Sequence, residues 1–160
     1  RSGRRSKYYL DKYRFETRPD LLRALGQAIA GTLREHEPEA ELIAGPELGA
    51  VALAAAASLE TGLPFLLVRK GAKDYGTSKR LEGAFREGQR VCLVEDVVTT
   101  GGAALEAVEA LRAAGLEVST AICVVDREEG GVDAFARQAV RLRPLYRASE
   151  LLNLPANPLG

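Results

Sequence analysis

The sequence predicts an α/β domain in which a mostly parallel sheet is flanked by helices. Short β-like apolar runs alternate along the chain with amphipathic helical stretches, the arrangement that produces such a sheet. The 160 residues are the size of one ordinary domain, so we expect a single domain over residues 1–160. Hydrophobic residues make up 46% and charged residues 28%, which excludes a disordered or collagen-like chain. No apolar run approaches the roughly 18 residues of a membrane span.

The first part of the chain contains two helical patterns and two strand-like runs. A helix begins at Pro19, because the fixed φ of proline suits a first helical turn, and apolar residues recur at helical spacing as far as Leu33. The alanine-rich stretch 51–59 predicts a helix packed closely on the sheet, closed by Gly62. The expected elements are an extended start at 8–13, the helix from Pro19, a strand at 42–44, the helix at 51–59 and a strand at 64–69.

A long polar segment separates these elements from the rest. Residues 70–85 contain three glycines and no clear periodicity, and they exceed the usual length of an α/β connection, which is typical of functional or disordered loops. Residues 90–95 contain an uninterrupted apolar run, 91–94, before a final carboxylate, as in a buried parallel strand. The elements expected next are a turn at 97–102, a helix at 103–114, a strand at 118–125, a helix at 132–138, a strand at 140–142 and a turn or helix at 149–152.

The charges balance overall but cluster locally. Lys and Arg number 22, as do Asp and Glu, which argues against a surface built for indiscriminate binding to nucleic acid or membranes. Residues 1–18 nevertheless contain seven basic groups against two acidic ones, and residues 69–80 contain five against one. Two cationic clusters in a neutral chain predict a local anionic ligand. Two merely solvated segments are the alternative.

The cysteines and the single histidine offer no metal site or catalytic triad. Cys92 and Cys123 each lie within an apolar run, without a second ligand at metal-binding spacing, and are predicted to be core residues. This use of cysteine fits a reducing compartment, and we expect a cytoplasmic protein. His36, at the polar end of the first helix, is expected at the surface. Because the chain opens at Arg1 and contains no methionine, we also expect a preceding N-terminal piece.

The most informative segment is 91–103, VCLVEDVVTTGGA, in which a buried strand ends in two carboxylates and a small-residue turn leads into a helix. Ligands of such sheets bind beyond the carboxyl ends of the strands. Residues 99–103 place backbone N–H groups and two hydroxyls at a helix N-terminus, which favours a phosphate. Glu95 and Asp96 would repel phosphate and are better suited to accept hydrogen bonds from vicinal sugar hydroxyls. The segment predicts a ribose 5-phosphate site, and an acidic strand end followed by a capped turn is the alternative.

This segment resembles the phosphoribosyl pyrophosphate (PRPP) signature of type I phosphoribosyltransferases. Neither the dinucleotide-binding fingerprint nor the P-loop pattern is present. Four further segments resemble, in order, motifs of the orotate phosphoribosyltransferase family: 2–9 (SGRRSKYY), 68–77 (VRKGAKDYGT), 81–83 (LEG) and 125–131 (VDREEGG). The resemblance implies the type I phosphoribosyltransferase fold, which is Rossmann-like, with a small N-terminal hood.

The resemblance also implies a reaction. Members transfer ribose 5-phosphate from PRPP to N1 of orotate, which gives orotidine 5′-monophosphate and pyrophosphate in pyrimidine (UMP) synthesis. They use Mg²⁺, which we expect to be held mainly by PRPP and water, without a dedicated set of protein ligands. It further implies a homodimer in which the loop that carries Lys73 acts in trans, and no nucleic-acid partner.

By position in the motifs, the resemblance assigns roles to individual residues. Lys73 and Asp96 are the expected catalytic residues. The expected PRPP-binding residues are Arg69, Lys70, Lys73, Tyr75, Glu95, Asp96, Val97, Val98, Thr99, Thr100, Gly101, Gly102 and Ala103, and the expected orotate-binding residues are Tyr9, Leu10, Thr99 and Arg127. Two departures stand out. Many members have His at the position of Tyr75, and residues 45–50, the expected pyrophosphate loop, lack a lysine found in some relatives.

Two alternative functions remain open at this point. A purine or orphan type I phosphoribosyltransferase would keep the PRPP segment and change the base pocket, but Arg127 and residues 2–9 argue against it. A non-catalytic, PRPP-sensing regulator of the same fold would bind nucleic acid through the basic N-terminal segment. The zero net charge and the presence of Lys73 argue against that interpretation.

Overall fold

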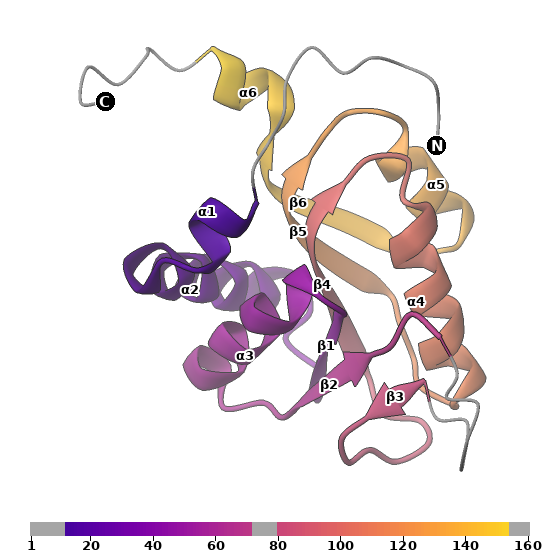
Figure 1. The fold of residues 1–160 in the computed structure, drawn as a ribbon. Helices are drawn as coiled ribbons and strands as arrows, with labels where there is room; N and C mark the ends of the chain where they lie inside the picture. Colours follow the sequence, from indigo (N-terminus) through magenta and orange to yellow (C-terminus); the bar gives the residue numbers. More distant parts are fainter. Residues whose placement is uncertain (1–11, 72–79, 154–160) are drawn as a thin grey trace.

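A computed structural model describes residues 12–71 and 80–153 of the chain (Figure 1). Among the helices within these residues, none combines the length and the apolar character that a membrane crossing requires. The elements in chain order are α1 (Tyr13–Glu16), α2 (Pro19–His36), β1 (Leu42–Pro46), α3 (Gly49–Thr61), β2 (Phe65–Val68), β3 (Leu81–Glu82), β4 (Val91–Val98), α4 (Gly102–Ala113), β5 (Thr120–Asp126), α5 (Gly131–Arg137), β6 (Arg141–Arg147) and α6 (Ala148–Leu152).

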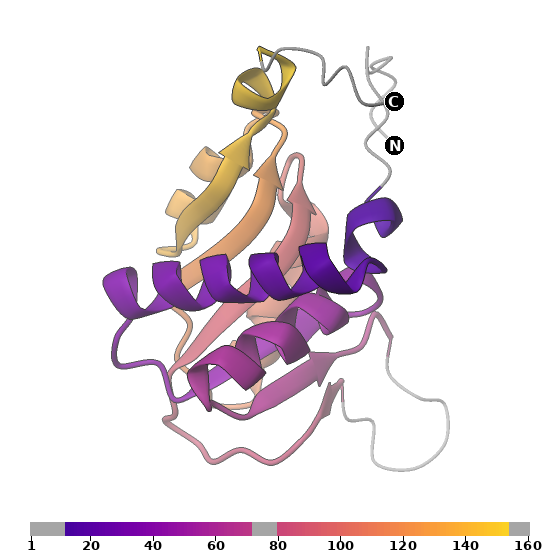
Figure 2. The ribbon, with the colours of Figure 1, turned by 90° about the vertical axis from the view of Figure 1, so that its left-hand side faces the viewer.

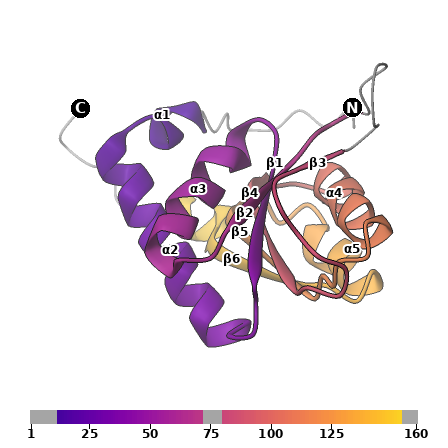
Figure 3. The same cartoon turned by 90° about the horizontal axis from the view of Figure 1, so that it is seen from below.

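The strands form one sheet in the order β3-β2-β1-β4-β5-β6. Every neighbouring pair is parallel except β2 and β3. The register places Ala44 of β1 opposite Leu66 of β2 on one side and Leu93 of β4 on the other. Seen from below, the sheet separates α1, α2 and α3 from α4 and α5 (Figure 3). The predicted fold class, a mostly parallel sheet flanked by helices, is confirmed.

The core lies on both faces of the sheet because successive strand residues point to opposite sides. Ile43, Cys92 and Val94 pack in the cluster that α2 and α3 cover. Their neighbours in sequence pack in the cluster that α4 and α5 cover, together with Cys123. Cys92 and Cys123 are both fully buried and free, as predicted for core residues.

The sequences of α2 and α3 explain where these helices begin and end and how they pack on the sheet. Pro19 occupies the start of α2 as expected, and Ile29 and Leu33 are buried beneath the helix. Figure 2 shows α2 crossing in front of the strands, with α3 beside it. The alanines of α3 let it approach the sheet closely, and Gly62 ends the helix with a φ of 77°.

Several boundaries differ from the prediction. The extended start predicted at 8–13 is wrong at its described end, where α1 begins at Tyr13, and the remainder lies outside the described residues. β4 continues through Val98 instead of turning at 97, because Val97 and Val98 pair with Val125 and Asp126 of β5. β3 was not predicted at all.

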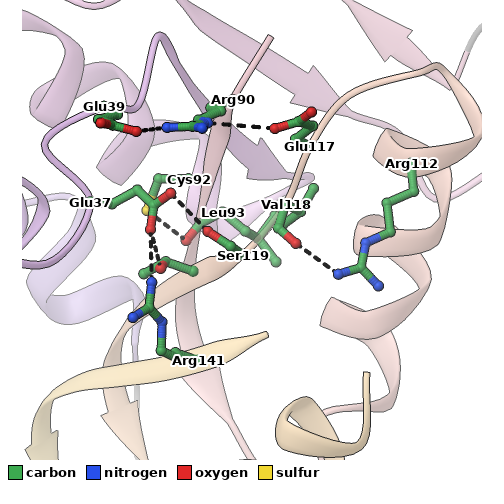
Figure 4. Close-up of polar contacts among 11 residues, drawn as sticks. Glu37, Glu39, Arg90, Cys92, Leu93, Arg112, Glu117, Val118, Ser119 and Arg141 are labelled. Atoms are coloured by element: carbon green, nitrogen blue, oxygen red, sulfur yellow. Dashed lines mark hydrogen bonds and ion pairs between the residues drawn. The ribbon is translucent and has the colours of Figure 1, made fainter. Parts of the chain in front are cut away.

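A polar network covers the edge of the sheet at the N-terminal ends of β4, β5 and β6, opposite to the ends where ligands bind in such folds (Figure 4). The carboxylate of Glu37, just after α2, accepts hydrogen bonds from Ser119 Oγ at 2.7 Å and from Thr120 Oγ1 at 2.5 Å. Arg141 NH2 lies 3.5 Å from the same carboxylate. Arg90 joins Glu39 and Glu117 in a second, more exposed group. Glu37 therefore ties the end of α2 to β5 and β6.

Replacement of Glu37 is expected to destabilise the fold. Glu37→Ala leaves the fully buried hydroxyl of Thr120 without its acceptor, so we expect the free energy of unfolding to fall by about 2–4 kcal/mol. Glu39→Ala is the matched control, because its side chain is 71% exposed and its surface ion pair contributes at most about 1 kcal/mol. Urea denaturation of both variants makes the comparison. Equal losses would show that Glu37 does not anchor α2.

Candidate functional site

The candidate site lies where the strand order of the sheet reverses direction. The chain passes from β1 outward to β2 and later returns to the opposite side of β1 as β4. The connections therefore diverge between the carboxyl ends of β1 and β4, and open α/β sheets bind ligands at such a point. Glu95 and Asp96 belong to β4, and Gly49 begins the helix that follows β1. The chain topology thus brings these segments together.

A pocket of about 530 Å³ occupies this position, within the usual range for small-molecule sites. Five segments line it, from the start of α1, the β1–α3 turn, the end of β2, the segment before β3, and the β4–α4 region. The lining residues are Lys12, Tyr13, Pro46, Glu47, Leu48, Gly49, Val68, Arg69, Lys70, Arg80, Glu95, Asp96, Val97, Val98, Thr99, Thr100, Gly101, Gly102, Ala103, Ala104, Glu106 and Ala107. The expected PRPP segment and the second cationic cluster therefore meet in one cavity.

The turn between β4 and α4 forms one end of the pocket. α4 begins at Gly102, and its first N–H groups have no partners within the helix, as at any helix N-terminus. Gly101 has a φ of 87°, a conformation that favours glycine, and a Cβ there would lie 3.2 Å from Phe135. Thr99 and Thr100 are exposed beside it. This end can receive an oxyanion through backbone N–H groups and two hydroxyls.

The opposite wall carries positive charge on a closed hairpin. Arg69 N donates to Arg80 O at 2.8 Å, and the guanidinium of Arg69 lies 3.5 Å from Glu82. Lys70 N donates to Glu47 Oε1 at 2.6 Å, which joins the end of β2 to the β1–α3 turn. The peptide bond that follows Glu47 is cis. Arg69, Lys70 and Arg80 thus present three cationic groups to the pocket.

Asp96 lies at the centre of a group of ionisable side chains. Its Oδ2 is 2.5 Å from Lys12 Nζ, and its Oδ1 accepts a hydrogen bond of 2.5 Å from Val97 N. Only 3% of Asp96 is exposed, and Glu16 beside it is 5% exposed. Burial opposes the charged form of Lys12, but its hydrogen bond and attraction to Asp96 prevail and raise the pKa of Lys12.

Two carboxyl groups next to Asp96 retain protons more readily than usual. Burial, reinforced by the negative charge of Asp96, raises the pKa of Glu95 to about 8 and that of Glu16 to about 7. Glu95 Oε1 also accepts a hydrogen bond from Asp96 N at 3.1 Å. Gly49, the first residue of α3, packs directly against this group. A Cβ there would lie 2.0 Å from Asp96 Oδ2. The site therefore places Asp96, which contacts Lys12, beside two carboxyl groups that keep their protons to a higher pH than ordinary glutamates.

Arg127 lies at the carboxyl end of the neighbouring strand β5. Its N–H donates to Val98 O at 2.8 Å, which holds it beside the end of β4. Its guanidinium pairs with Glu129 at 3.0 Å, and its side chain is 19% exposed. Arg127 is not among the residues that line the pocket, but it lies next to the strand end that supplies them.

The predicted site residues divide into three groups. Arg69, Lys70 and residues 95–103 line one pocket, although their individual roles remain predictions. Arg127 adjoins it. Four residues lie outside the described part of the chain: Tyr9, Leu10, Lys73 and Tyr75.

Sequence reasoning missed several residues around the pocket. Lys12, Glu16 and Arg80 were not among the predicted site residues, although Lys12 and Arg80 belong to the two predicted cationic clusters. The four-residue spacing of Lys12 and Glu16 is a signal that would place both on one side of a helical turn. It does not reveal Asp96 as their common neighbour, because that contact spans 84 positions.

Comparison with known proteins gives a consistent result. The phosphoribosyl transferase domain family matches residues 14–136. An orotate phosphoribosyltransferase of Methanocella arvoryzae is 49% identical over 156 residues, which cover 94% of this chain and 85% of that protein. One of Halobacterium salinarum is 47% identical over 151 residues, 94% of this chain and 84% of that protein.

Solved structures show the same likeness. The orotate phosphoribosyltransferase of Aeropyrum pernix has a TM-score of 0.85 at 32% identity, covering 94% of this chain and 85% of that one. The Mycobacterium tuberculosis orotate phosphoribosyltransferase in complex with PRPP has a TM-score of 0.78 at 30% identity, covering 89% and 82%. A UMP synthase of Leishmania donovani has a TM-score of 0.84 at 31% identity. The match covers 94% of this chain but only 32% of that longer one.

Proposed function

Because this chain belongs to the orotate phosphoribosyltransferase family, we propose that it transfers ribose 5-phosphate from PRPP to orotate. The products are orotidine 5′-monophosphate and pyrophosphate. One observation carries the proposal. The acidic strand end and helix N-terminus of residues 95–103 line the same pocket as Arg69 and Lys70, so a single cavity holds a sugar site, a phosphate site and a cationic wall.

The turn before α4 is suited to the 5′-phosphate. Its N–H groups and the hydroxyls of Thr99 and Thr100 offer hydrogen bonds to an oxyanion, and the helix dipole favours negative charge there. Asp96, at the end of the preceding strand, is placed to accept hydrogen bonds from the ribose hydroxyls. This arrangement would hold the ribose through its 5′-phosphate on one side and through its ring hydroxyls on the other.

The pyrophosphate would leave toward Arg69, Lys70 and Arg80. The C1–O bond of PRPP breaks as pyrophosphate departs. N1 of orotate supplies the electron pair for the new bond, and the proton of N1 leaves to the pyrophosphate or to water. Positive charge develops on the ribosyl ring in the transition state, where the nearby carboxylate of Asp96 stabilises it. Lys73, outside the described residues, is assigned to the same leaving group. The protein's contribution is positioning and electrostatic stabilisation rather than covalent catalysis.

Mg²⁺ is the proposed cofactor. The residues present fit an ion that is held mainly by PRPP oxygens and water, because the nearest carboxylates already have partners: Asp96 binds Lys12, and Glu47 accepts from Lys70 N. When bound, Mg²⁺ would neutralise part of the pyrophosphate charge. No residue of the chain is assigned to it as a direct ligand.

Arg127 is proposed to bind the carboxylate of orotate. A guanidinium can hold a carboxylate through two parallel hydrogen bonds, and this guanidinium already pairs with the carboxylate of Glu129. The hydrogen bond of Arg127 N to Val98 O places the residue beside Thr99, the other described residue expected at the base. Tyr9 and Leu10 complete the proposed orotate pocket from outside the described residues.

Substitution of Arg127 should weaken the binding of orotate without weakening the binding of PRPP. Arg127→Ala is expected to raise the KM for orotate about 10- to 100-fold, because a charge-assisted pair contributes roughly 1.5–3 kcal/mol. The Kd for PRPP, measured by calorimetry without orotate, should change little. Arg137→Ala, at the end of α5, is the charge-matched control. Equal losses for both substrates would mean that Arg127 supports the fold instead.

Release of pyrophosphate in the presence of PRPP and Mg²⁺ tests the function itself. We expect release to require orotate and to yield orotidine 5′-monophosphate in equal amount. Release with adenine, guanine or hypoxanthine but not orotate would favour a purine phosphoribosyltransferase. PRPP binding without turnover, combined with nucleic-acid binding, would favour a regulator.

The proposed assembly is a homodimer in which Lys73 serves the partner's site. The segment between Arg69 and Arg80 begins and ends at the pocket, so both of its ends are fixed beside the proposed reaction site. A two-fold axis would make both sites equivalent. A cytoplasmic location is also proposed, supported by the two free, buried cysteines.

A further inference from the structure

We propose that Lys12 and Glu16 set the charge of the Asp96 carboxylate and thereby control how tightly the pocket holds the ribose ring of PRPP. This inference rests on the proposed function, because it takes Asp96 to be the ribose-binding carboxylate. Neither Lys12 nor Glu16 is assigned contact with the reacting atoms. Both are positioning residues that act through Asp96.

The contacts place the two residues on one buried oxygen. Lys12 Nζ lies 2.5 Å from Asp96 Oδ2, with a third of the lysine side chain exposed at the pocket. Glu16 follows one helical turn later, and its Oε1 is buried without a hydrogen-bond partner. The position of a Cβ on Gly49 would be 2.0 Å from Asp96 Oδ2 and 3.0 Å from Glu16 Oε1. The carboxyl groups of Asp96 and Glu16 therefore both pack against α3 at Gly49.

Charge balance in this group depends on Lys12. Glu95 on β4 is the third carboxyl group, and Cys123 on β5 is a thiol whose pKa is raised by burial, so it stays neutral. Glu47, Arg69, Lys70 and Arg80 line the same pocket. None of these four described residues forms an ion pair with Asp96. Among the described residues, Lys12 therefore supplies the positive charge in contact with Asp96, between two other carboxyl groups.

The two residues have opposite effects on Asp96. Lys12 favours the carboxylate form, which accepts strong hydrogen bonds from ribose hydroxyls. An ionised Glu16 would favour protonation of Asp96, and the raised pKa of Glu16, about 7, means that it loses its proton in the neutral range. Without Lys12, three carboxyl groups share the site with no cation in contact with Asp96, so PRPP should bind weakly at low pH and recover as pH rises.

The test is calorimetric titration of the intact protein with PRPP and Mg²⁺ from pH 6 to 9. We expect Lys12→Met to weaken PRPP binding about tenfold at pH 6.5, the size of effect expected when a charged group loses one charge-assisted partner. The loss should shrink as pH rises toward 9, where carboxyl groups are ionised without help from a neighbouring cation. Lys12→Arg should restore the wild-type profile. In Lys12→Met/Glu16→Gln, removal of the competing acid should recover much of the affinity near neutral pH.

Arg14→Met is the matched control, because it removes one positive charge from the exposed side of the same helix. Its profile should follow the wild type, which also corrects for titration of the PRPP phosphates. A flat profile for Lys12→Met, with or without an overall loss, would overturn the inference. So would failure of Glu16→Gln to restore binding in the double variant.

The two proposals fail in different ways. If the wild-type protein bound no PRPP at any pH, the proposed function and this inference would both be wrong. If it bound PRPP and converted orotate while Lys12→Met retained the wild-type profile, only the inference would be wrong. Lys12→Gln provides a second neutral variant, and thermal melts show whether each variant is folded before its titration is interpreted.

Discussion

Mixing two inactive variants is expected to restore about a quarter of wild-type activity. Lys73→Ala removes a cation assigned to the departing pyrophosphate, and Asp96→Asn removes the carboxylate assigned to the ribose. Each homodimer should retain at most a few per cent of kcat/KM, a loss of about 2–3 kcal/mol. If Lys73 acts in trans, a heterodimer has one site with both lesions and one with neither. Random exchange at equal amounts makes about half of the dimers mixed, hence about a quarter of all sites intact.

Subunit exchange must be demonstrated independently, for example with two affinity tags on the two variants. A mixture of Lys73→Ala with Lys73→Ala carrying the second tag is the control, and it should stay inactive. Exchange without recovery of activity would show that Lys73 serves its own subunit, or that its segment is not catalytic. The trans arrangement would then be wrong, whereas the proposed reaction would stand.

Gly49→Ala is expected to reduce kcat/KM for PRPP about 100-fold. The new Cβ would lie 2.0 Å from Asp96 Oδ2 and 3.1 Å from its Cγ, so either the carboxylate or the start of α3 must move. Displacement of a substrate-positioning group by about 1 Å has effects of this size. The strain of adding a methyl group to a packed site should also lower the free energy of unfolding by about 1–3 kcal/mol.

Gly31→Ala is the matched control for Gly49→Ala. No atom lies within 4 Å of a Cβ at Gly31 in α2, and alanine stabilises an exposed helix position by roughly 0.5–1 kcal/mol. Steady-state kinetics and thermal unfolding of both variants provide the comparison. Full activity of Gly49→Ala would show that Asp96 can move without loss, which would contradict its assignment to the ribose.

The alternation of helices and strands could be predicted because burial on both faces of a parallel sheet leaves continuous apolar runs. β4 was found in this way, and its carboxylates and turn identified the pocket. Its last residues were misplaced because Glu95 and Asp96 look like the end of a strand, whereas pairing with β5 continues through Val98. The polar residues of the site therefore make β4 look shorter in the sequence than it is in the structure.

Other features depended on contacts that no local pattern contains. β3 consists of two residues, Leu81 and Glu82, and forms only because Val68 and Leu67 of β2 lie opposite. Glu16 ends the short helix α1 and Lys12 immediately precedes it, and their part in the site arises from packing against β4. The sequence alone shows the residue types and spacings but not which distant side chains become neighbours.

The short pairing of β3 with β2 also bears on how the pocket can vary among related chains. Because Arg69 N and Arg80 O are already joined at 2.8 Å, the two ends of the intervening segment meet whatever its length. Lengthening such a closed segment changes mainly its closure entropy, by about 0.6 kcal/mol for each doubling. Insertions and deletions between Arg69 and Arg80 can therefore accumulate at little cost to stability, and without disturbing the register of the sheet behind them.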